Sequence, residues 1–222
     1  MTSDKLGRQL KDLRISVTDR CNFRCPYCMP SEIYGDRYQF LPKDDLLTFE
    51  EITRLASIFA NLGVNKIRIT GGEPLVRNSV EELIANLSCI PEIVDLTMTT
   101  NGYLLPQKAQ LLKNSGLNRI TISLDTLDED VFRRMNGRNF GPDRVLEGIK
   151  SAEKAGLTPI KINAVIQRGV NDHTILQLAN FVRDRGHILR FIEYMDVGTL
   201  NNWNMSEVVP ATEIIQMISQ LS

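Results

Sequence analysis

Six strand-like segments alternate with helix-like segments along the 222 residues, and this alternation constrains the fold more than any other feature. The first, Leu13-Arg14-Ile15-Ser16-Val17-Thr18, alternates apolar and polar residues as a half-buried strand does. The predicted strands are 13–18, 65–70, 93–100, 118–125, 158–166 and 188–195. Strands that are separated by helices favour parallel βα units, because two parallel neighbours need a long crossover.

The predicted helices carry start and stop signals. Two of them begin at S/T-x-x-E capping boxes, Thr48 to Glu51 and Ser79 to Glu82. Further helices are predicted at 106–114, 128–135, 142–155, 174–185 and 212–221. Glycine ends several of the helices, at Gly63, Gly116, Gly156 and Gly186.

The predicted fold class is α/β, an open, incomplete (βα)6 TIM-type barrel of parallel strands with the helices outside. Six right-handed units fall short of the eight that close a barrel, so we expect a gap. A chain of this length, with 42% hydrophobic residues, suffices for one core, and we expect a single domain over 1–222. The irregular stretch 31–47 is long enough to be a lid.

Charge and hydropathy argue against two function classes. The net charge of -1 disfavours a nucleic-acid binder, and no apolar run approaches the ~20 residues of a membrane-spanning helix. The first five residues contain no apolar signal core, so we expect a cytoplasmic location. A homodimer stays open beside a monomer, because no feature of the sequence decides the oligomeric state.

Three of the four cysteines, Cys21, Cys25 and Cys28, lie on the loop that follows the first predicted strand. Gaps of three and two residues on a curled loop can point three sulfurs at one centre, and thiolates suit zinc or an iron-sulfur cluster. A four-iron cluster on three thiolates would keep one iron open. Two alternatives remain, a disulfide with a spare thiol and a zinc ion completed by His173, His187 or Cys89. Otherwise Cys89 is expected to be a buried structural thiol.

Alternation of side chains along the strands predicts a polar barrel interior. The apolar face should meet the helices, and the polar face carries Arg14, Ser16, Thr18, Lys66, Arg68, Thr70, Thr97, Thr99, Arg119, Thr121, Ser123, Asp125, Lys161 and Asn163. Arg14, Arg68 and Lys161 would converge there, and burying unpaired ions is costly. Asp125 can neutralise only one of them. The alternative is that each cation reaches a rim or pairs with a glutamate. We interpret the interior as an anion-accepting cavity suited to a phosphorylated substrate.

Ligands in such folds bind at the carboxyl ends of the strands, where several loops carry polar residues. Gly71-Gly72-Glu73-Pro74 follows the second strand, and its glycines would let a ligand approach the backbone while Glu73 offers a carboxylate. Thr99-Thr100-Asn101-Gly102 and Ser123-Leu124-Asp125 end the next two strands, and Met195 ends the sixth. Taken singly, each loop also fits an ordinary tight turn.

In combination, these motifs resemble those of the radical S-adenosylmethionine superfamily. The resemblance rests on Cys21-x3-Cys25-x2-Cys28 after a strand, on Tyr27 before the last cysteine, and on the GGEP run at 71–74. It implies a 4Fe-4S cluster on the three cysteines, with S-adenosylmethionine on the open iron and its methionine end held by the glycines and Glu73.

Longer runs resemble the GTP 3′,8-cyclase family, the molybdenum cofactor biosynthesis protein A family, over nearly the whole chain. These runs are 13–25, 68–75 (RITGGEPL) and 191–195 (FIEYM). The resemblance implies S-adenosylmethionine contacts by Tyr27, Gly72, Ser123 and Met195, and GTP contacts by Arg14, Arg68, Thr99 and Lys161.

The implied activity is that of a lyase. GTP would be converted to (8S)-3′,8-cyclo-7,8-dihydroguanosine 5′-triphosphate through a 5′-deoxyadenosyl radical that is generated at the cluster, and an electron donor would be required. No side chain is assigned as catalytic. The family's second three-cysteine cluster region is absent from the 222 residues, so turnover by this chain is expected to be incomplete. The alternatives are a radical enzyme with another substrate and a non-catalytic metal-bound scaffold.

Overall fold

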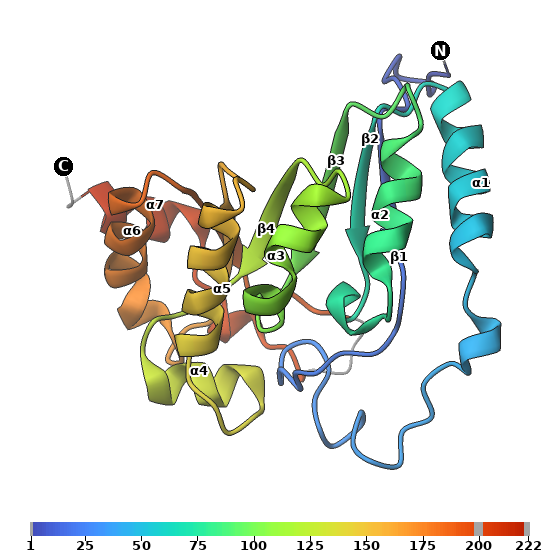
Figure 1. Cartoon of the computed structure of the whole chain (residues 1–222). Coiled ribbons are helices and arrows are strands. Elements are labelled where there is room, and N and C mark those ends of the chain that lie inside the picture. The colour runs from blue at the N-terminus through green and yellow to red at the C-terminus, as the bar shows by residue number, and fades with distance from the viewer. Residues whose placement is uncertain (1, 198–201, 220–222) are drawn as a thin grey trace.

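The computed structural model describes residues 2–197 and 202–219 and contains one parallel six-stranded sheet (Figure 1). The strands follow the chain in the order β1-β2-β3-β4-β5-β6. Their bounds are β1 Asp12–Ser16, β2 Lys66–Thr70, β3 Asp95–Thr100, β4 Arg119–Ser123, β5 Lys161–Ile166 and β6 Ile188–Glu193. All six predicted strands are confirmed, and their ends differ from the predicted ones by at most three residues.

Helices follow the strands and complete the βα alternation. The α-helices are α1 Phe49–Asn61, α2 Val80–Ser88, α3 Leu105–Asn114, α4 Glu129–Asn136, α5 Asp143–Lys154, α6 Ile175–Asp184 and α7 Ala211–Ile218. Single 3₁₀ turns lie at η1 Lys43–Asp45, η2 Pro74–Val76, η3 Asp172–Thr174 and η4 Met205–Glu207. Figure 1 shows α1, α2, α3 and α5 along the outer side of the sheet.

The sheet is an open barrel. Each strand pairs in parallel with its neighbours in sequence, from β1 with β2 to β5 with β6. Within the described ranges, β1 and β6 are the two ends of the sheet and do not pair with each other. The expected gap is therefore present, because six units do not supply enough strands to close the ring.

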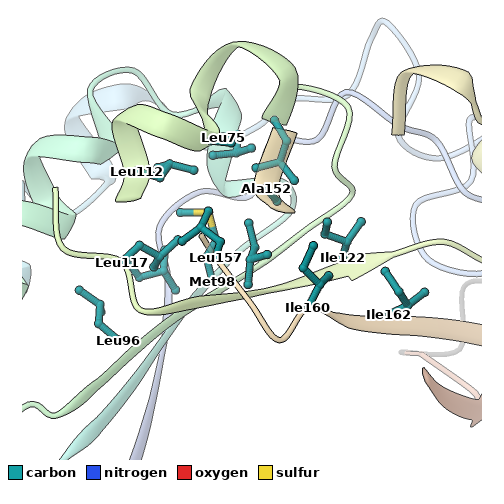
Figure 2. Close-up of a cluster of buried hydrophobic side chains, with 14 of the residues drawn as sticks. Leu75, Leu96, Met98, Leu112, Leu117, Ile122, Ala152, Leu157, Ile160 and Ile162 are labelled. Atoms are coloured by element: carbon teal, nitrogen blue, oxygen red, sulfur yellow. The ribbon is translucent and has the colours of Figure 1, made fainter. Parts of the chain in front are cut away.

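The core lies between the sheet and the helices, as the alternation predicts. Ile67 and Ile69 on β2 and Ile120 and Ile122 on β4 are buried in one cluster with residues of the helices. Figure 2 shows part of this cluster, in which Met98, Ile122 and Ile160 from the sheet region lie near Leu112 and Ala152 of the helices. The opposite sheet face is left to polar side chains.

The two predicted capping boxes have different outcomes. Thr48 caps α1 in full, because its side chain accepts from the Glu51 N–H and the Glu51 carboxylate accepts from the Thr48 N–H. At α2 the prediction of a capping box is wrong, because Ser79 has a left-handed backbone (φ 56°) and its side chain makes no capping hydrogen bond. The reason is local backbone geometry, since a cap needs an extended backbone to turn its side chain over the first helical turn.

Two further expectations concern burial and membranes. Cys89, expected to be a buried thiol, is exposed because it is the C-terminal cap of α2 and lies beyond that helix's apolar stripe. In the part of the chain that the structure describes, no helix has both the length and the apolar character to cross a bilayer.

Candidate functional site

A cavity of about 240 Å³ lies where the strands end, and residues from the cysteine loop and from the loops after the strands line it together. Cys21, Cys25 and Cys28 form one side. The rest of the lining is Phe23, Tyr27, Thr70, Gly71, Gly72, Glu73, Thr99, Thr100, Asn101, Ser123, Asp125, Phe132, Met135, Asn136, Asn163, Val165 and Ile192. The structure thus brings together motifs that are spread along the sequence from Cys21 to Asp125.

The cysteine loop is curled by its own backbone. The N–H groups of Cys28 and Met29 both donate to the Cys25 carbonyl, at 2.9 and 2.8 Å. The side chain of Arg24, which belongs to the loop, adds two bonds: its Nη1 donates to the carbonyls of Cys21 and Phe23, each at 2.7 Å. These bonds hold the loop in a shape that presents all three sulfurs to the cavity.

The end of α4 supports the same loop through a close backbone approach. The Arg24 N–H donates to the Asn136 carbonyl at 2.9 Å. Gly137 then turns with φ 63°, and a Cβ built there would lie 2.0 Å from the Arg24 carbonyl oxygen. Both the left-handed conformation and the contact therefore require glycine at this position.

The sulfurs lie in an environment that keeps them neutral while no metal is bound. Burial raises the pKa of Cys21 to about 11 and that of Cys25 well above its usual range, and burial and Asp125 raise that of Cys28. Thiolate ligands therefore require compensating positive charge, which iron supplies, and binding should release protons.

The donor set fits an iron-sulfur cluster better than the two alternatives. All four cysteines are free thiols, so the disulfide interpretation has no support. None of the three residues considered as a fourth zinc ligand, His173, His187 and Cys89, lines the cavity. Among the described residues, no three Cys, His, Asp or Glu side chains converge closely enough for a single ion. A cluster spans a larger space between its ligands, and three thiols around one cavity suit it.

Glu73 is the most deeply buried carboxylate of the cavity, with 1% of its surface exposed. Its Oε1 accepts from Thr100 Oγ1 at 2.6 Å and from the Leu75 N–H at 3.0 Å, while Oε2 accepts from the Asn101 N–H at 2.7 Å. Burial raises its pKa to about 7 despite these bonds. A cation that enters the cavity would favour the charged form.

The glycines before Glu73 allow the second strand's loop to meet the cysteine loop. Gly71 has φ 148°, and a Cβ there would lie 2.5 Å from the Thr18 carbonyl oxygen. A Cβ on Gly72 would lie 2.4 Å from the Arg20 carbonyl oxygen. The N–H groups of Gly72 and Glu73 donate to those same two carbonyls. No larger residue would permit this contact without movement of the backbone.

The cations of the sheet interior form a second part of the site. In register, Arg14 on β1 lies beside Arg68 on β2, and Lys161 on β5 lies beside Thr121 on β4. Burial and the charges of Arg119, Arg190, Lys66 and Arg68 lower the pKa of Lys161. Each of these four cations therefore lies close enough to Lys161 to disfavour its charged form.

Some of these cations have partners in the protein. Lys66 pairs with Asp12 at 2.7 Å, Arg119 pairs with Asp95, and Arg190 Nε donates to Asn163 at 3.0 Å. Among the described residues, Arg68 and Lys161 have no carboxylate within ion-pair distance. Asp125 serves neither of them, because it bonds to Tyr27 and to the Val165 N–H. At most one cation could have been neutralised by Asp125, and in the structure it neutralises neither of these two.

The sequence-predicted residues fall into three groups. The cavity lining includes Cys21, Cys25, Cys28, Tyr27, Gly72, Glu73, Thr99 and Ser123. Arg14, Arg68 and Lys161 lie outside that lining, on the same polar sheet face. Met195 is 54% exposed after β6 and does not line the cavity. It lies three residues before 198–201, which are outside the described residues.

The sequence placed Asn101 in a strand-end loop and Asn163 on the polar face without a role for either, and Arg190 was not among the predicted site residues. Arg190 pairs in register with Asn163, so the alternation of side chains along β6 could have predicted that Arg190 lies on the polar face. Asn101 stands in the Thr-Thr-Asn-Gly run, where its hydrogen bonds could not be foreseen, because their partners come from two other loops.

The profile of the radical SAM superfamily matches residues 15–182. A GTP 3′,8-cyclase of Acidothermus cellulolyticus is 57% identical over 216 residues, which are 97% of this chain and 60% of the relative. A GTP 3′,8-cyclase of Staphylococcus haemolyticus is 53% identical over 215 residues, 97% of this chain and 63% of the relative. The chain thus spans about three fifths of the length of these curated relatives.

A solved structure shares the fold. The crystal structure of Streptococcus suis SuiB bound to S-adenosylmethionine has a TM-score of 0.74 with 19% sequence identity, and the match covers 95% of this chain and 47% of that one. At this identity the likeness supports the open barrel architecture and nothing finer.

Proposed function

The chain belongs to the radical SAM superfamily, and we propose that it is the core of a GTP 3′,8-cyclase that acts in molybdenum cofactor biosynthesis. The observation that carries this proposal is the arrangement of the polar sheet face. A cavity with three thiols and a buried carboxylate lies at its carboxyl end, and cations without carboxylate partners lie along it. The names of the relatives that match 97% of the chain support the same activity.

The cofactors of the superfamily are a 4Fe-4S cluster and S-adenosylmethionine. Cys21, Cys25 and Cys28 would hold the cluster through three of its irons. Glu73 would accept the ammonium group of S-adenosylmethionine, and Gly72 lets the ligand approach the backbone. When bound, the pair supplies the radical that removes hydrogen from the substrate ribose.

The cations on the polar face of the sheet would hold the triphosphate of GTP. We call Arg14, Arg68, Lys161 and Arg190 the cation face. Arg68 and Lys161 are partly buried, so a phosphate that pairs with them would replace water rather than a protein carboxylate. Arg14 at the edge of the sheet and Arg190 on β6 would extend the same face. These residues would then neutralise the phosphates, hold the ribose beside the cavity and exclude water.

Three finer points belong to the same proposal. Tyr27, Ser123 and Met195 would contact S-adenosylmethionine, and Thr99 would contact GTP. A one-electron donor would reduce the cluster, and the unit over 1–222 would act as one core domain that can also form a homodimer. Because the cation face recognises phosphates, the described part of the chain alone should bind GTP and ATP almost equally.

The test uses the anaerobically reconstituted chain. Iron and sulfide per chain, 5′-deoxyadenosine formation, and binding of GTP and ATP at two salt concentrations are measured. We expect about four irons, S-adenosylmethionine cleavage, and salt-sensitive binding of both nucleotides, with slow or absent cyclised product. Zinc in place of iron would contradict the cluster, and binding that salt does not weaken would contradict the cation face.

A further inference from the structure

Asn101 follows β3 directly and hydrogen-bonds to two parts of the cavity wall, Glu73 and the cysteine loop. Its backbone N–H donates to Glu73 Oε2 at 2.7 Å. Its side-chain Nδ2 donates to Asn22 Oδ1 at 2.7 Å and lies 3.9 Å from Cys21 Sγ. One residue therefore touches the carboxylate assigned to S-adenosylmethionine and a sulfur assigned to the cluster.

The amide of Asn101 is held in one orientation. Its Oδ1 accepts from the Tyr103 N–H at 3.1 Å, so the other end of the amide, which carries two N–H groups, faces Asn22 and Cys21. Two N–H groups suffice for two acceptors, and one already serves Asn22. The second is available to the sulfur.

The sulfur of Cys21 accepts hydrogen bonds from more than one direction. The Phe23 N–H donates to it at 3.4 Å, and Asn101 approaches it from the β3 side. Once the thiol is deprotonated as a ligand, the sulfur can only accept, and its negative charge strengthens both bonds. Hydrogen bonds to ligand sulfurs are among the factors that set the reduction potential of a cluster.

We propose that Asn101 is a positioning residue that ties the Cys21 sulfur to the Glu73 carboxylate, so that binding of S-adenosylmethionine at Glu73 changes the reduction potential of the cluster. This inference rests on the proposed function of the site. A ligand ammonium that pulls on Glu73 moves the backbone N–H of Asn101, which is bonded to it. The side-chain N–H of Asn101 moves with the backbone and alters its bond to the sulfur.

The test is a redox titration of the reconstituted cluster, followed by electron paramagnetic resonance, with and without S-adenosylmethionine. Asn101→Ala removes the donor. Asn101→Asp keeps the acceptor for the Tyr103 N–H and places an oxygen where the donor was. We expect both variants to lower the equilibrium constant for reduction of the cluster about tenfold. This corresponds to a reduction potential lower by about 59 mV for a one-electron couple. Both should also lose most of the shift that S-adenosylmethionine causes in the wild type.

Asn114→Asp is the matched control, because it makes the same chemical change at an exposed position on α3 outside the cavity. It should keep the wild-type potential and shift. If Asn101→Ala does not retain iron, Asn101→Asp carries the test.

The inference is overturned if both Asn101 variants keep wild-type iron content, potential and ligand-induced shift. It is also overturned if S-adenosylmethionine leaves the wild-type potential unchanged while it is being cleaved. A wild-type chain that binds no iron or cleaves no S-adenosylmethionine would instead contradict the proposed function.

Discussion

The hydroxyl of Tyr27 donates a 2.6 Å hydrogen bond to Asp125 Oδ2 and so ties the cysteine loop to the end of β4, 98 residues later in the sequence. Asp125 Oδ1 accepts from the Val165 N–H at 2.9 Å, which extends the tie to β5. Burial raises the pKa of Asp125 to about 6 and that of Tyr27 well above its usual range. The pair therefore attaches the loop to the sheet.

Removing that hydrogen bond should destabilise the protein. Tyr27→Phe takes the donor from a buried carboxylate oxygen, which costs about 1–3 kcal/mol when the oxygen is left without a partner. Urea denaturation of the unloaded protein at pH 8, where Asp125 is charged, measures the loss. Tyr38→Phe, a change at an exposed tyrosine, should leave stability within about 0.5 kcal/mol. Equal stability of Tyr27→Phe and the wild type would show that the bond is not formed in solution.

Each cysteine of the loop should be required for iron. Cys25→Ala removes one of three thiolates, and the reconstituted variant should hold almost no iron, because two ligands leave two irons open. Cys89→Ala removes the exposed thiol at the C-terminal cap of α2 and should hold as much iron as the wild type. Unchanged iron content in Cys25→Ala, measured by a colorimetric iron assay and absorption, would contradict the ligand assignment.

Affinity for S-adenosylmethionine should rise with pH between about 6 and 8. The pKa of Glu73 is about 7, so its carboxyl is mostly neutral at pH 6 and mostly charged at pH 8, and only the charged form pairs with an ammonium group. The rise should reach about tenfold over this window, because the ionised fraction grows by about that factor. Titration calorimetry of the reconstituted protein measures it.

Glu73→Gln is the control for this pH dependence. It keeps the shape of the side chain and removes the titrating group, so its affinity should be lower and should not change over the same window. A Glu73→Gln variant that retains the full pH dependence would assign the titration to another group.

Removing a charge from the cation face should weaken the binding of nucleoside triphosphates. Arg68→Ala or Lys161→Ala removes a charge-assisted contact worth about 1.5–3 kcal/mol, so nucleoside triphosphate affinity should fall roughly ten- to a hundredfold. The dependence of binding on salt should also become weaker. Arg54→Ala, at an exposed position on α1, should bind as the wild type does. Unchanged affinity in both face variants would place the triphosphate elsewhere.

The sequence by itself determined the order and type of the elements and the composition of the two sheet faces. Period-2 alternation is a local property, so it predicted that Ile67 and Ile69 would be buried while Arg68 faces the other way, and both hold in the structure. Motifs that are contiguous in the chain, such as Cys21 to Cys28 and Gly71 to Pro74, could likewise be assigned to loops at the strand ends.

Only the tertiary structure decided which side chains form hydrogen bonds with one another. That Asp125 bonds to Tyr27 instead of neutralising a cation depends on where the cysteine loop crosses the end of β4. The contacts of Asn101 with Glu73 and Cys21 join three loops, and the exposure of Cys89 depends on how α2 packs. Partners of this kind are separated by tens of residues, and only the packing of the parallel strands brings them within hydrogen-bonding distance.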